Sequence, residues 1–257
     1  NDTYPHVMEE RLNKACSEAR YEVINLGIPH LRSENIRSLF FGEALTLNPD
    51  IVTFYEGMND TVSMAGLSGR IVDIAIKGTK ENMFLRKMVD IYAVLRDRIV
   101  LVFFLENSLV YFSDRTFSTD DFDYHLKGKS DKFLKNLSEI KDECAKRGIL
   151  FIVANQQSRS LAPDMGNIKG TSYQREVEHL RQKLQREGVN IWELRFLIHA
   201  SLMGELKKWA LNNNIPFVDV IKSMDGDRDS LISWVHVNPK GNSIIAKAFE
   251  DEILKQT

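Results

Sequence analysis

The sequence contains little cysteine, which limits the kinds of site that it can hold. Its two cysteines, Cys16 and Cys144, lie far apart and form neither a CxxC pair nor a disulfide framework. We expect both to be buried thiols, and they leave the redox compartment open. The 6 histidines show no HxxxH or HExxH spacing, and there is no GxGxxG loop. We therefore expect neither a metal nor a cofactor.

The sequence also lacks an excess of charge and long apolar runs. It has 34 Lys and Arg against 36 Asp and Glu, a formal net charge of −2 and a pI of about 6.4. Nucleic-acid binding needs clustered basic residues that neutralise phosphates, so nucleic acid is not an expected partner. The strongest apolar run, residues 99–105, is too short to cross a bilayer and is flanked by Arg98 and Glu106. No transmembrane segment is expected in this chain.

An initiator methionine and a signal-peptide pattern are also absent. The first residue, Asn1, is followed directly by a helix-like segment. This start predicts that the natural protein begins upstream of Asn1.

Apolar periodicity indicates helices that alternate with short buried strands. Apolar residues spaced by four, three and four mark an amphipathic helix, and continuous apolar runs of about five residues are typical of parallel strands buried on both faces. This alternation predicts an α/β fold with a doubly wound parallel sheet and right-handed crossovers. The expected helices are 4–19, 33–45 with Ser33 as N-cap, 132–147 with Gly148 as C-cap, 174–187, a segment through 211, and 241–255; the expected strands are 21–26, 51–55, 149–155 and 215–220.

The segment 61–131 interrupts this alternation with aromatic and charged residues. We interpret it as an insertion into a single domain that spans 1–257. It is either a helical pair that thickens the core or a lid over the site, and the first alternative is favoured.

Polar residues follow the expected strands at the edge where α/β proteins build their sites. Gly57 and Asn59 come directly after strand 51–55, where the glycine allows a sharp turn and the Asn amide can donate to an oxyanion. Ordinary turn chemistry explains the same residues. Gly27 follows strand 21–26 and offers a backbone N–H, although a tight turn is the simpler explanation.

Three further residues fall near the same edge. His236 lies in the loop before the last helix, where a histidine can act as a general base, although a lone histidine is more often structural. Asn155 follows strand 149–155 and His30 lies close after Gly27, so both are candidates for substrate contacts. Polar residues at strand ends need no such function.

Taken together, VINLGIP at 23–29, GMND at 57–60 and VHVNPKGN at 235–242 resemble the second, third and fifth blocks of the SGNH (GDSL-type) hydrolases. The resemblance runs over nearly the whole chain. It implies an esterase with a flavodoxin-like, three-layer α/β/α sandwich. Residues 2–13 are similar to the phrase that follows the first block, which places the first strand and its nucleophilic serine upstream, roughly ten residues before Asn1.

The resemblance also implies a role for each matched residue. Gly27 would supply a backbone N–H and Asn59 its side-chain amide to the oxyanion hole, and His236 would be the general base. The family usually has an Asp three residues before this histidine, but here that position is Ser233. Asp229 is the first candidate to replace it, and a solvated acidic loop is an equally good explanation of Asp229.

The expected function is therefore a serine-dependent ester hydrolase that acts on an acylated small molecule, sugar or lipid. Because Ser233 carries no charge, a catalytically weakened domain that binds such a ligand is the alternative. A nucleotide-binding or response-regulator domain of the same architecture is disfavoured by the missing phosphate-binding loops.

Overall fold

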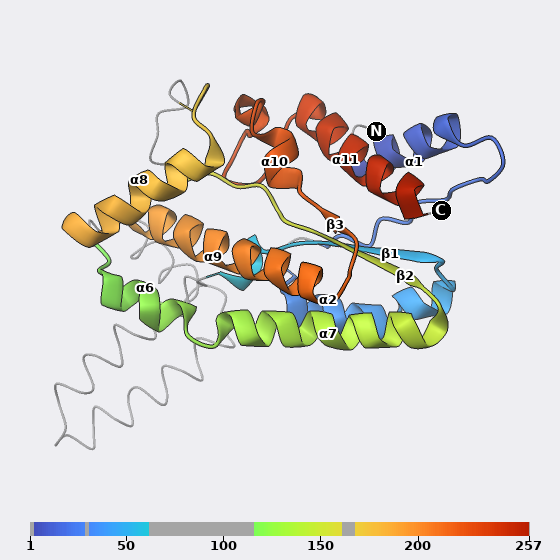
Figure 1. Ribbon diagram of the computed structural model, residues 1–257, viewed down its shortest axis with the longest axis horizontal. Helices are drawn as coiled ribbons and strands as arrows, with labels where there is room; N and C mark the ends of the chain where they lie inside the picture. The colour runs from blue at the N-terminus through green and yellow to red at the C-terminus, as the bar shows by residue number, and fades with distance from the viewer. Residues whose placement is uncertain (1–2, 29–30, 62–115, 161–167, 257) are drawn as a thin grey trace, which may run out of the picture.

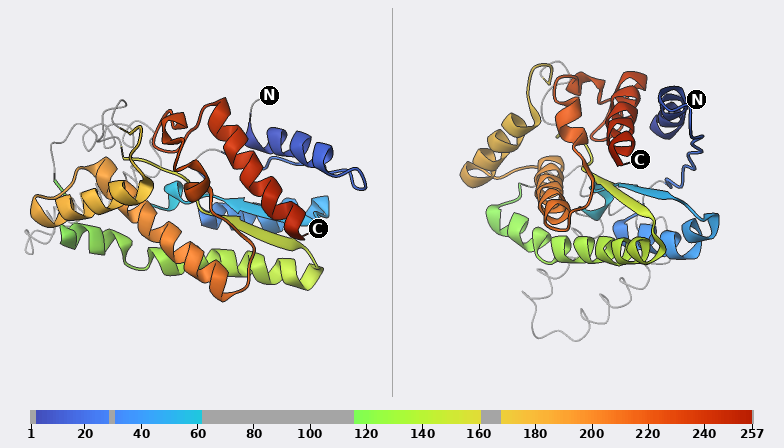
Figure 2. Two further views of the ribbon diagram at one scale, coloured as in Figure 1. Left: turned by 45° about the horizontal axis from the view of Figure 1, so that its top comes forward. Right: turned by 45° about the vertical axis from the view of Figure 1, so that its right-hand side comes forward.

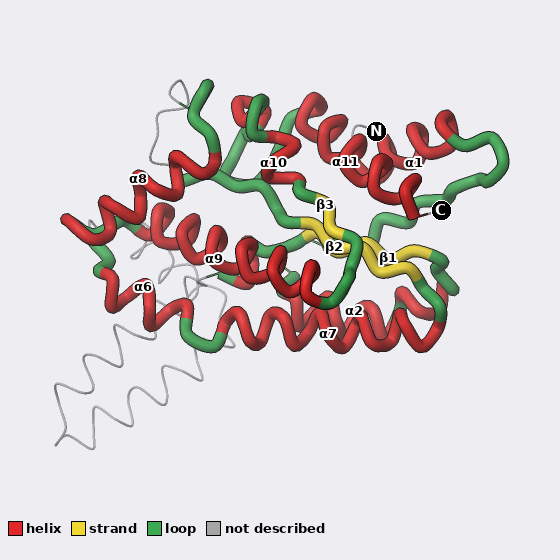
Figure 3. The backbone as a smooth tube through the Cα atoms, in the orientation of Figure 1, coloured by secondary structure: helices red, strands yellow, loops and turns green. Residues whose placement is uncertain are grey.

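The computed structural model describes residues 3–28, 31–61, 116–160 and 168–256 (Figure 1). Its sheet has three parallel strands in the order β1 (Ile51–Tyr55), β2 (Leu150–Ala154) and β3 (Phe217–Val218). Ile51 lies opposite Leu150, and Val153 lies opposite Phe217. The strands form a short central band with helices on both sides (Figure 3).

The central strand β2 shows why the fold has three layers. Its side chains alternate between two hydrophobic clusters, with Phe151 and Val153 in one and Ile152 and Ala154 in the other. One cluster is covered by α1 (Tyr4–Ala15), α10 (Val220–Met224) and α11 (Pro239–Gln256); the other is covered by α2 (Ser33–Gly42), α7 (Lys129–Arg147), α8 (Tyr173–Arg186) and α9 (Ile191–Asn212) (Figures 1 and 2). The α/β/α sandwich with a parallel sheet is thus confirmed.

The helices follow from their apolar spacing and their end signals. In α7 the buried residues Phe133, Leu137, Ile140 and Cys144 recur at intervals of four, three and four. The helix ends at Gly148, whose φ of 69° is the left-handed conformation that glycine tolerates, as predicted. By contrast, α9 is apolar on most sides because it lies between α7 and α8, which both pack against it.

One expected strand is absent from the described residues. Residues 21–26 are not assigned to a strand, although Tyr21 and Val23 still pack against the core. A strand requires a hydrogen-bonded neighbour, and the ladders of the described chain join only β1, β2 and β3. The expected strand is therefore wrong: the segment is only partly buried, with Ile24 exposed, and it lies outside the sheet.

Several expected boundaries shift for local reasons. The first helix ends at Ala15 rather than residue 19. Arg32 is the N-cap of α2 and Ser33 its first residue, and the helix ends at Gly42 before a short 3-10 turn, Ala44–Leu47. The third strand stops at Val218 because Asp219 caps α10 by accepting a hydrogen bond from the Lys222 N–H.

Only part of the expected insertion can be compared with the structure, because residues 62–115 lie outside the described residues. The rest belongs to the sandwich itself. Phe117 is buried and forms an antiparallel bridge with Val189, and α6 (Thr119–Leu126) packs against α9 and α7. The insertion at 61–131 stays a prediction.

Candidate active site

The turn after β1 places Asn59 at the carboxyl edge of the sheet. Residues Met58–Asp60 form a 3-10 turn in which the Asn59 N–H donates to Glu56 Oε1 at 2.8 Å. The Asn59 side-chain amide donates to the Leu31 carbonyl oxygen at 3.0 Å. A primary amide has two N–H groups, and the described residues provide no acceptor for the second one. The turn thus presents an amide donor beside Leu31.

Position 57 is tightly packed because side chains of α9 approach this turn closely. A Cβ atom built on Gly57 would lie 2.3 Å from Met203 Cε and 3.2 Å from His199 Nε2. Both residues belong to α9. The turn that carries Asn59 therefore rests directly on this helix.

Two consecutive glutamines after β2 connect the Asn59 turn with the His236 loop. Gln156 Oε1 accepts a hydrogen bond from the Met58 N–H at 2.9 Å. The neighbouring Gln157 donates through Nε2 to the Val235 carbonyl oxygen at 2.7 Å. Asn59 follows Met58, and His236 follows Val235. The neighbouring residues Gln156 and Gln157 therefore bind the backbone directly before Asn59 and directly before His236.

His236 is exposed, and its ring is held by Ser233. The distance from His236 Nδ1 to Ser233 Oγ is 2.6 Å, and Ser233 Oγ also accepts the His236 backbone N–H at 3.0 Å. When Nδ1 carries the proton, Ser233 is the acceptor and Nε2 is left to accept a proton from a nucleophile. This is the geometry of a general base whose orienting partner is neutral.

The expected replacement carboxylate, Asp229, does not reach this ring. Asp229 lies exposed in the short 3-10 turn Arg228–Ser230, and no hydrogen bond between it and His236 occurs among the described residues. Its charge instead helps to raise the pKa of Lys240, an effect that comes mainly from Asp227. The position that an aspartate would fill is taken by Ser233.

The other predicted residues have different surroundings. The Gly27 N–H donates to the exposed Asn25 side chain at 2.9 Å, so a ligand would have to displace that oxygen. Asn155 is buried, with Nδ2 bound to Asp219 Oδ1 at 2.7 Å and Oδ1 bound to the Ile221 N–H at 3.0 Å. Its amide fixes the start of α10, and a substrate contact from it stays a prediction. His30 lies outside the described residues.

Glu56 is a site residue that sequence reasoning missed. Burial raises the pKa of its carboxyl to about 7, and Asp60 adds to the effect, while hydrogen bonds from the Asn59 and Gly57 N–H groups oppose it. A carboxyl with such a pKa changes charge near neutral pH. The signal in the sequence was a charged residue directly after an apolar strand.

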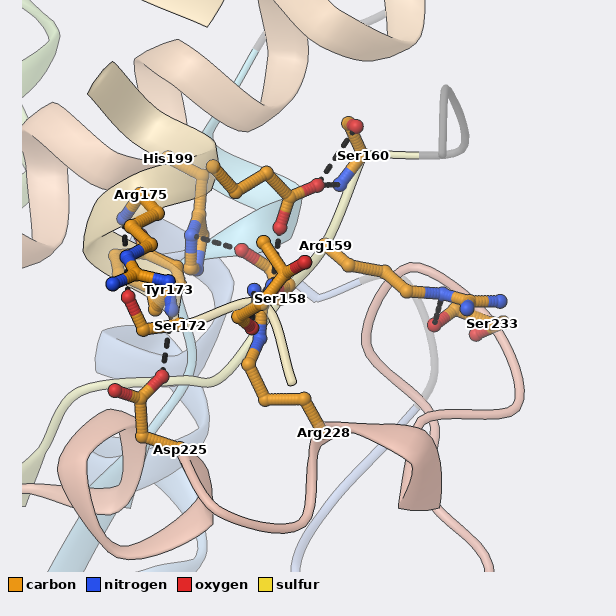
Figure 4. A network of polar contacts seen from close by, with 12 residues as sticks. Ser158, Arg159, Ser160, Ser172, Tyr173, Arg175, His199, Asp225, Arg228 and Ser233 are labelled. Carbon is orange, nitrogen blue, oxygen red and sulfur yellow. Dashed lines mark hydrogen bonds and ion pairs between the residues drawn. The ribbon is translucent and has the colours of Figure 1, made fainter. Parts of the chain in front are cut away.

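A buried polar network lies next to the carboxyl edge of the sheet, around the residues that follow β2 (Figure 4). Arg228 forms an ion pair with Glu176 and donates through Nη2 to the Ser158 carbonyl oxygen at 3.0 Å. Glu176 Oε1 accepts hydrogen bonds from the Ser160 N–H and hydroxyl, both at 2.8 Å. All of these side chains are almost fully buried. Because buried charges must be paired, the network ties the segment after β2 to α8 and to the loop before His236.

His199 belongs to the same network and stays neutral. Its Nδ1 lies 2.8 Å from Ser158 Oγ, while the buried Nε2 has no partner in the described part of the chain. Burial lowers the pKa of His199 to about 3, helped by the positive charge of Arg195. Because both Ser158 and His199 are inaccessible, this pair is a structural contact rather than a second nucleophile and base.

The described residues contain no group of three His, Cys, Asp or Glu side chains arranged to hold a metal. Cys16 and Cys144 are free thiols, and burial raises the pKa of Cys144 to about 11. No helix within the described ranges is long and apolar enough to cross a membrane.

Comparison with known proteins finds similar structures but no similar sequence. No protein-family model and no curated protein matches the sequence. An acetyl xylan esterase, AlAXEase, superposes with a TM-score of 0.54 at 15% identity, covering 97% of this chain and 90% of that one. A catalytic mutant of an acetylxylan esterase from Geobacillus stearothermophilus gives 0.52 at 16% identity, covering 98% and 80%. An α/β hydrolase from the metagenome of Lake Arreo, Spain, gives 0.51 at 16% identity, covering 98% and 81%. The chain therefore shares its fold with these esterases and this hydrolase.

Proposed function

We propose that this protein is a serine-dependent ester hydrolase, with His236 as general base and Asn59 and Gly27 as oxyanion donors. The observation that carries the proposal is a pair of hydrogen bonds: Gln156 accepts one from the Asn59 turn, and Gln157 donates one to the His236 loop. They hold a proton acceptor and an amide donor against one edge of the sheet. A base and an oxyanion donor at one site are the two groups that acyl transfer requires from a protein besides its nucleophile.

The proposed reaction follows the acyl-transfer template. The hydroxyl of a serine upstream of Asn1 attacks the ester carbonyl carbon, and its proton passes to His236 Nε2. The second N–H of the Asn59 amide and the backbone N–H of Gly27 stabilise the oxyanion. The Gly27 N–H must first leave its hydrogen bond to the Asn25 side chain. His236 then gives the proton to the leaving alcohol. Water repeats the sequence and releases the acid.

The substrate class that we propose is an acylated small molecule, sugar or lipid, with acetyl esters as the first choice. Support for the acetyl group comes from two proteins of the same fold that are acetyl xylan esterases. The fold alone does not select a substrate, so the acyl and alcohol groups rest on this analogy.

The test is hydrolysis of 4-nitrophenyl acetate by the full-length protein and two variants. His236→Ala should lose roughly a thousandfold or more in kcat, since removal of a catalytic base leaves only binding and oxyanion stabilisation. His179→Ala, at an exposed position of α8, is the matched control and should keep wild-type activity. Unchanged turnover by His236→Ala would overturn the proposed mechanism.

A second candidate function is a domain that binds an acylated carbohydrate or lipid with little turnover. It is favoured by one observation, the neutral Ser233 in contact with His236 Nδ1. A Ser233→Asp variant separates the two candidates, because only a weakened enzyme gains rate from it.

A further inference from the structure

Arg195 has an unusual position for a charged residue. Its guanidinium carbon lies 5.5 Å from the ring centroid of Trp192 and 5.9 Å from that of Trp234. The two indole rings stack on each other, with centroids 4.9 Å apart and planes inclined by 23°. A planar guanidinium against aromatic rings keeps its charge while losing part of its hydration. We refer to these three residues as the Arg–Trp cluster.

The positive charge of Arg195 is not neutralised within the described part of the chain. It forms no ion pair there, and its hydrogen bond to Thr61 Oγ1 is long, at 3.5 Å. Burial lowers the pKa of Arg195, and no carboxylate among the described residues acts in the opposite direction. The same charge is felt by His199, whose pKa it helps to lower. A partly desolvated cation without a counter-ion is costly, and an anion bound to it would recover that cost.

The cluster lies between the two halves of the proposed site. Thr61, which Arg195 contacts, follows the Met58–Asp60 turn that carries Asn59. Trp234 lies two residues before His236, and the two rings are 6.4 Å apart. Arg195 and Trp192 belong to α9, so the charge is fixed on a long, mostly buried helix rather than on a loop. A ligand at His236 therefore lies near both the cation and the indole rings.

We infer that the Arg–Trp cluster binds an anionic group, a carboxylate or a phosphate ester, on the substrate of this site. The inference rests on the proposed function for the statement that the ligand is a substrate. The guanidinium presents a fork of N–H donors that matches both oxyanions in a bidentate manner. The ester bond would then lie at His236, and the anionic group on the acyl or alcohol side would lie at Arg195.

The binding test uses this chain and needs no catalysis. Two of its 3 tryptophans belong to the cluster, so quenching of intrinsic fluorescence reports occupancy. The probes are benzoate, phenyl phosphate and benzyl alcohol, which share a ring and differ in charge. A charge-assisted hydrogen bond contributes about 1.5–3 kcal/mol, so one of the anions should bind at least about tenfold more tightly than the alcohol. Which anion binds better identifies the group.

Two variants complete this test. Arg195→Gln should abolish the preference for the anion, whereas Arg181→Gln, at an exposed position of α8, should retain it. Equal binding of the three probes by the wild type would overturn the inference, as would an unchanged preference in a folded Arg195→Gln protein. Should Arg195→Gln fail to fold, the wild type alone decides: its anion preference must weaken steeply with ionic strength.

A turnover test separates this inference from the proposed function. Full-length protein is offered phenyl acetate and 4-acetoxybenzoate, and the ratio of their kcat/KM values is compared between wild type and Arg195→Gln. A ratio of at least about ten in the wild type that falls toward one in the variant supports the inference. Hydrolysis of both esters with a ratio near one in both proteins would overturn it and leave the esterase standing. No hydrolysis, with anion binding intact, would overturn only the proposed function.

Discussion

The hydroxyl oxygen of Ser233 lies 2.6 Å from Nδ1 of His236, at the position where SGNH-type hydrolases usually place a carboxylate. A hydroxyl can hold the imidazole ring in one orientation. It provides no negative charge to stabilise the imidazolium that forms when the base takes a proton. Ser233 can thus orient the ring of His236 without adding the charge of a carboxylate.

Ser233→Asp should therefore raise esterase activity. In the serine-protease template a neutral replacement of the aspartate costs about ten-thousandfold, so the reverse change should gain at least about tenfold in kcat. The carboxylate can also accept the His236 N–H that Ser233 Oγ now accepts. Ser233→Asn is the neutral control and should gain nothing. If a folded Ser233→Asp protein gains no rate and still binds its ligand, the binding-domain candidate is favoured.

Asn59→Ala should reduce kcat by roughly a hundredfold or more, because it removes a preorganised oxyanion donor. It also removes the hydrogen bond to Leu31, which should cost about 1 kcal/mol of stability. Steady-state kinetics together with urea denaturation measure the two effects. The control is Asn213→Ala at the exposed end of α9, which loses a similar amide-to-carbonyl bond to Trp209. Equal losses of kcat in both variants would argue against the oxyanion role.

The raised pKa of Glu56 predicts a pH-dependent stability. Its folded-state value of about 7 lies above the ordinary 4.5, so the favourable contribution of the protonated carboxyl is complete below about pH 4.5 and is lost as the pH rises through 7. Glu56→Gln keeps an acceptor for the Asn59 N–H and removes the titration. Its stability advantage over wild type should grow by about 2–3 kcal/mol between pH 5 and pH 8. Denaturant unfolding at both pH values measures it, and a constant difference would contradict the burial argument.

Glu176→Gln should destabilise the protein by about 3 kcal/mol, because it leaves Arg228 charged and buried without its partner. The control is Glu252→Gln, which removes the partner of the mostly exposed Lys255 and should cost less than about 1 kcal/mol. Thermal unfolding of the two variants gives the comparison. Similar losses in both would mean that the buried network contributes little to the stability of this edge.

Much of the fold could be predicted from the sequence because the core follows strict periodicities. The apolar spacing of α7, the glycine that ends it and the continuous strands β1 and β2 were all readable. Residues 21–26 were not, because an apolar segment becomes a strand only beside a hydrogen-bonded partner, and this one stays partly exposed. The short β3 was overestimated because the cap at Asp219 depends on a side-chain contact that periodicity does not show.

The site was predictable only in part for the same reason. Sequence blocks indicated Asn59 and His236, but the connection through Gln156 and Gln157 depends on tertiary contacts that are 98 and 78 residues apart in the chain. Arg195 lies on a helix whose sequence is typical of a core element. A single arginine in such a sequence is ordinarily interpreted as a residue on the exposed side of the helix. The Trp192 and Trp234 rings meet only in the folded protein.

One consequence follows from the way α9 presents its residues. Trp192, Arg195, His199 and Met203 are spaced by three, four and four, so they lie along one stripe of the helix. Inserting a single residue after Arg195 would rotate the two halves of that stripe by about 100° relative to each other. The side chains of Trp192 and Arg195 would then no longer share a helix face with His199 and Met203, which pack against Gly57. We therefore expect α9 to tolerate substitutions far more readily than insertions or deletions.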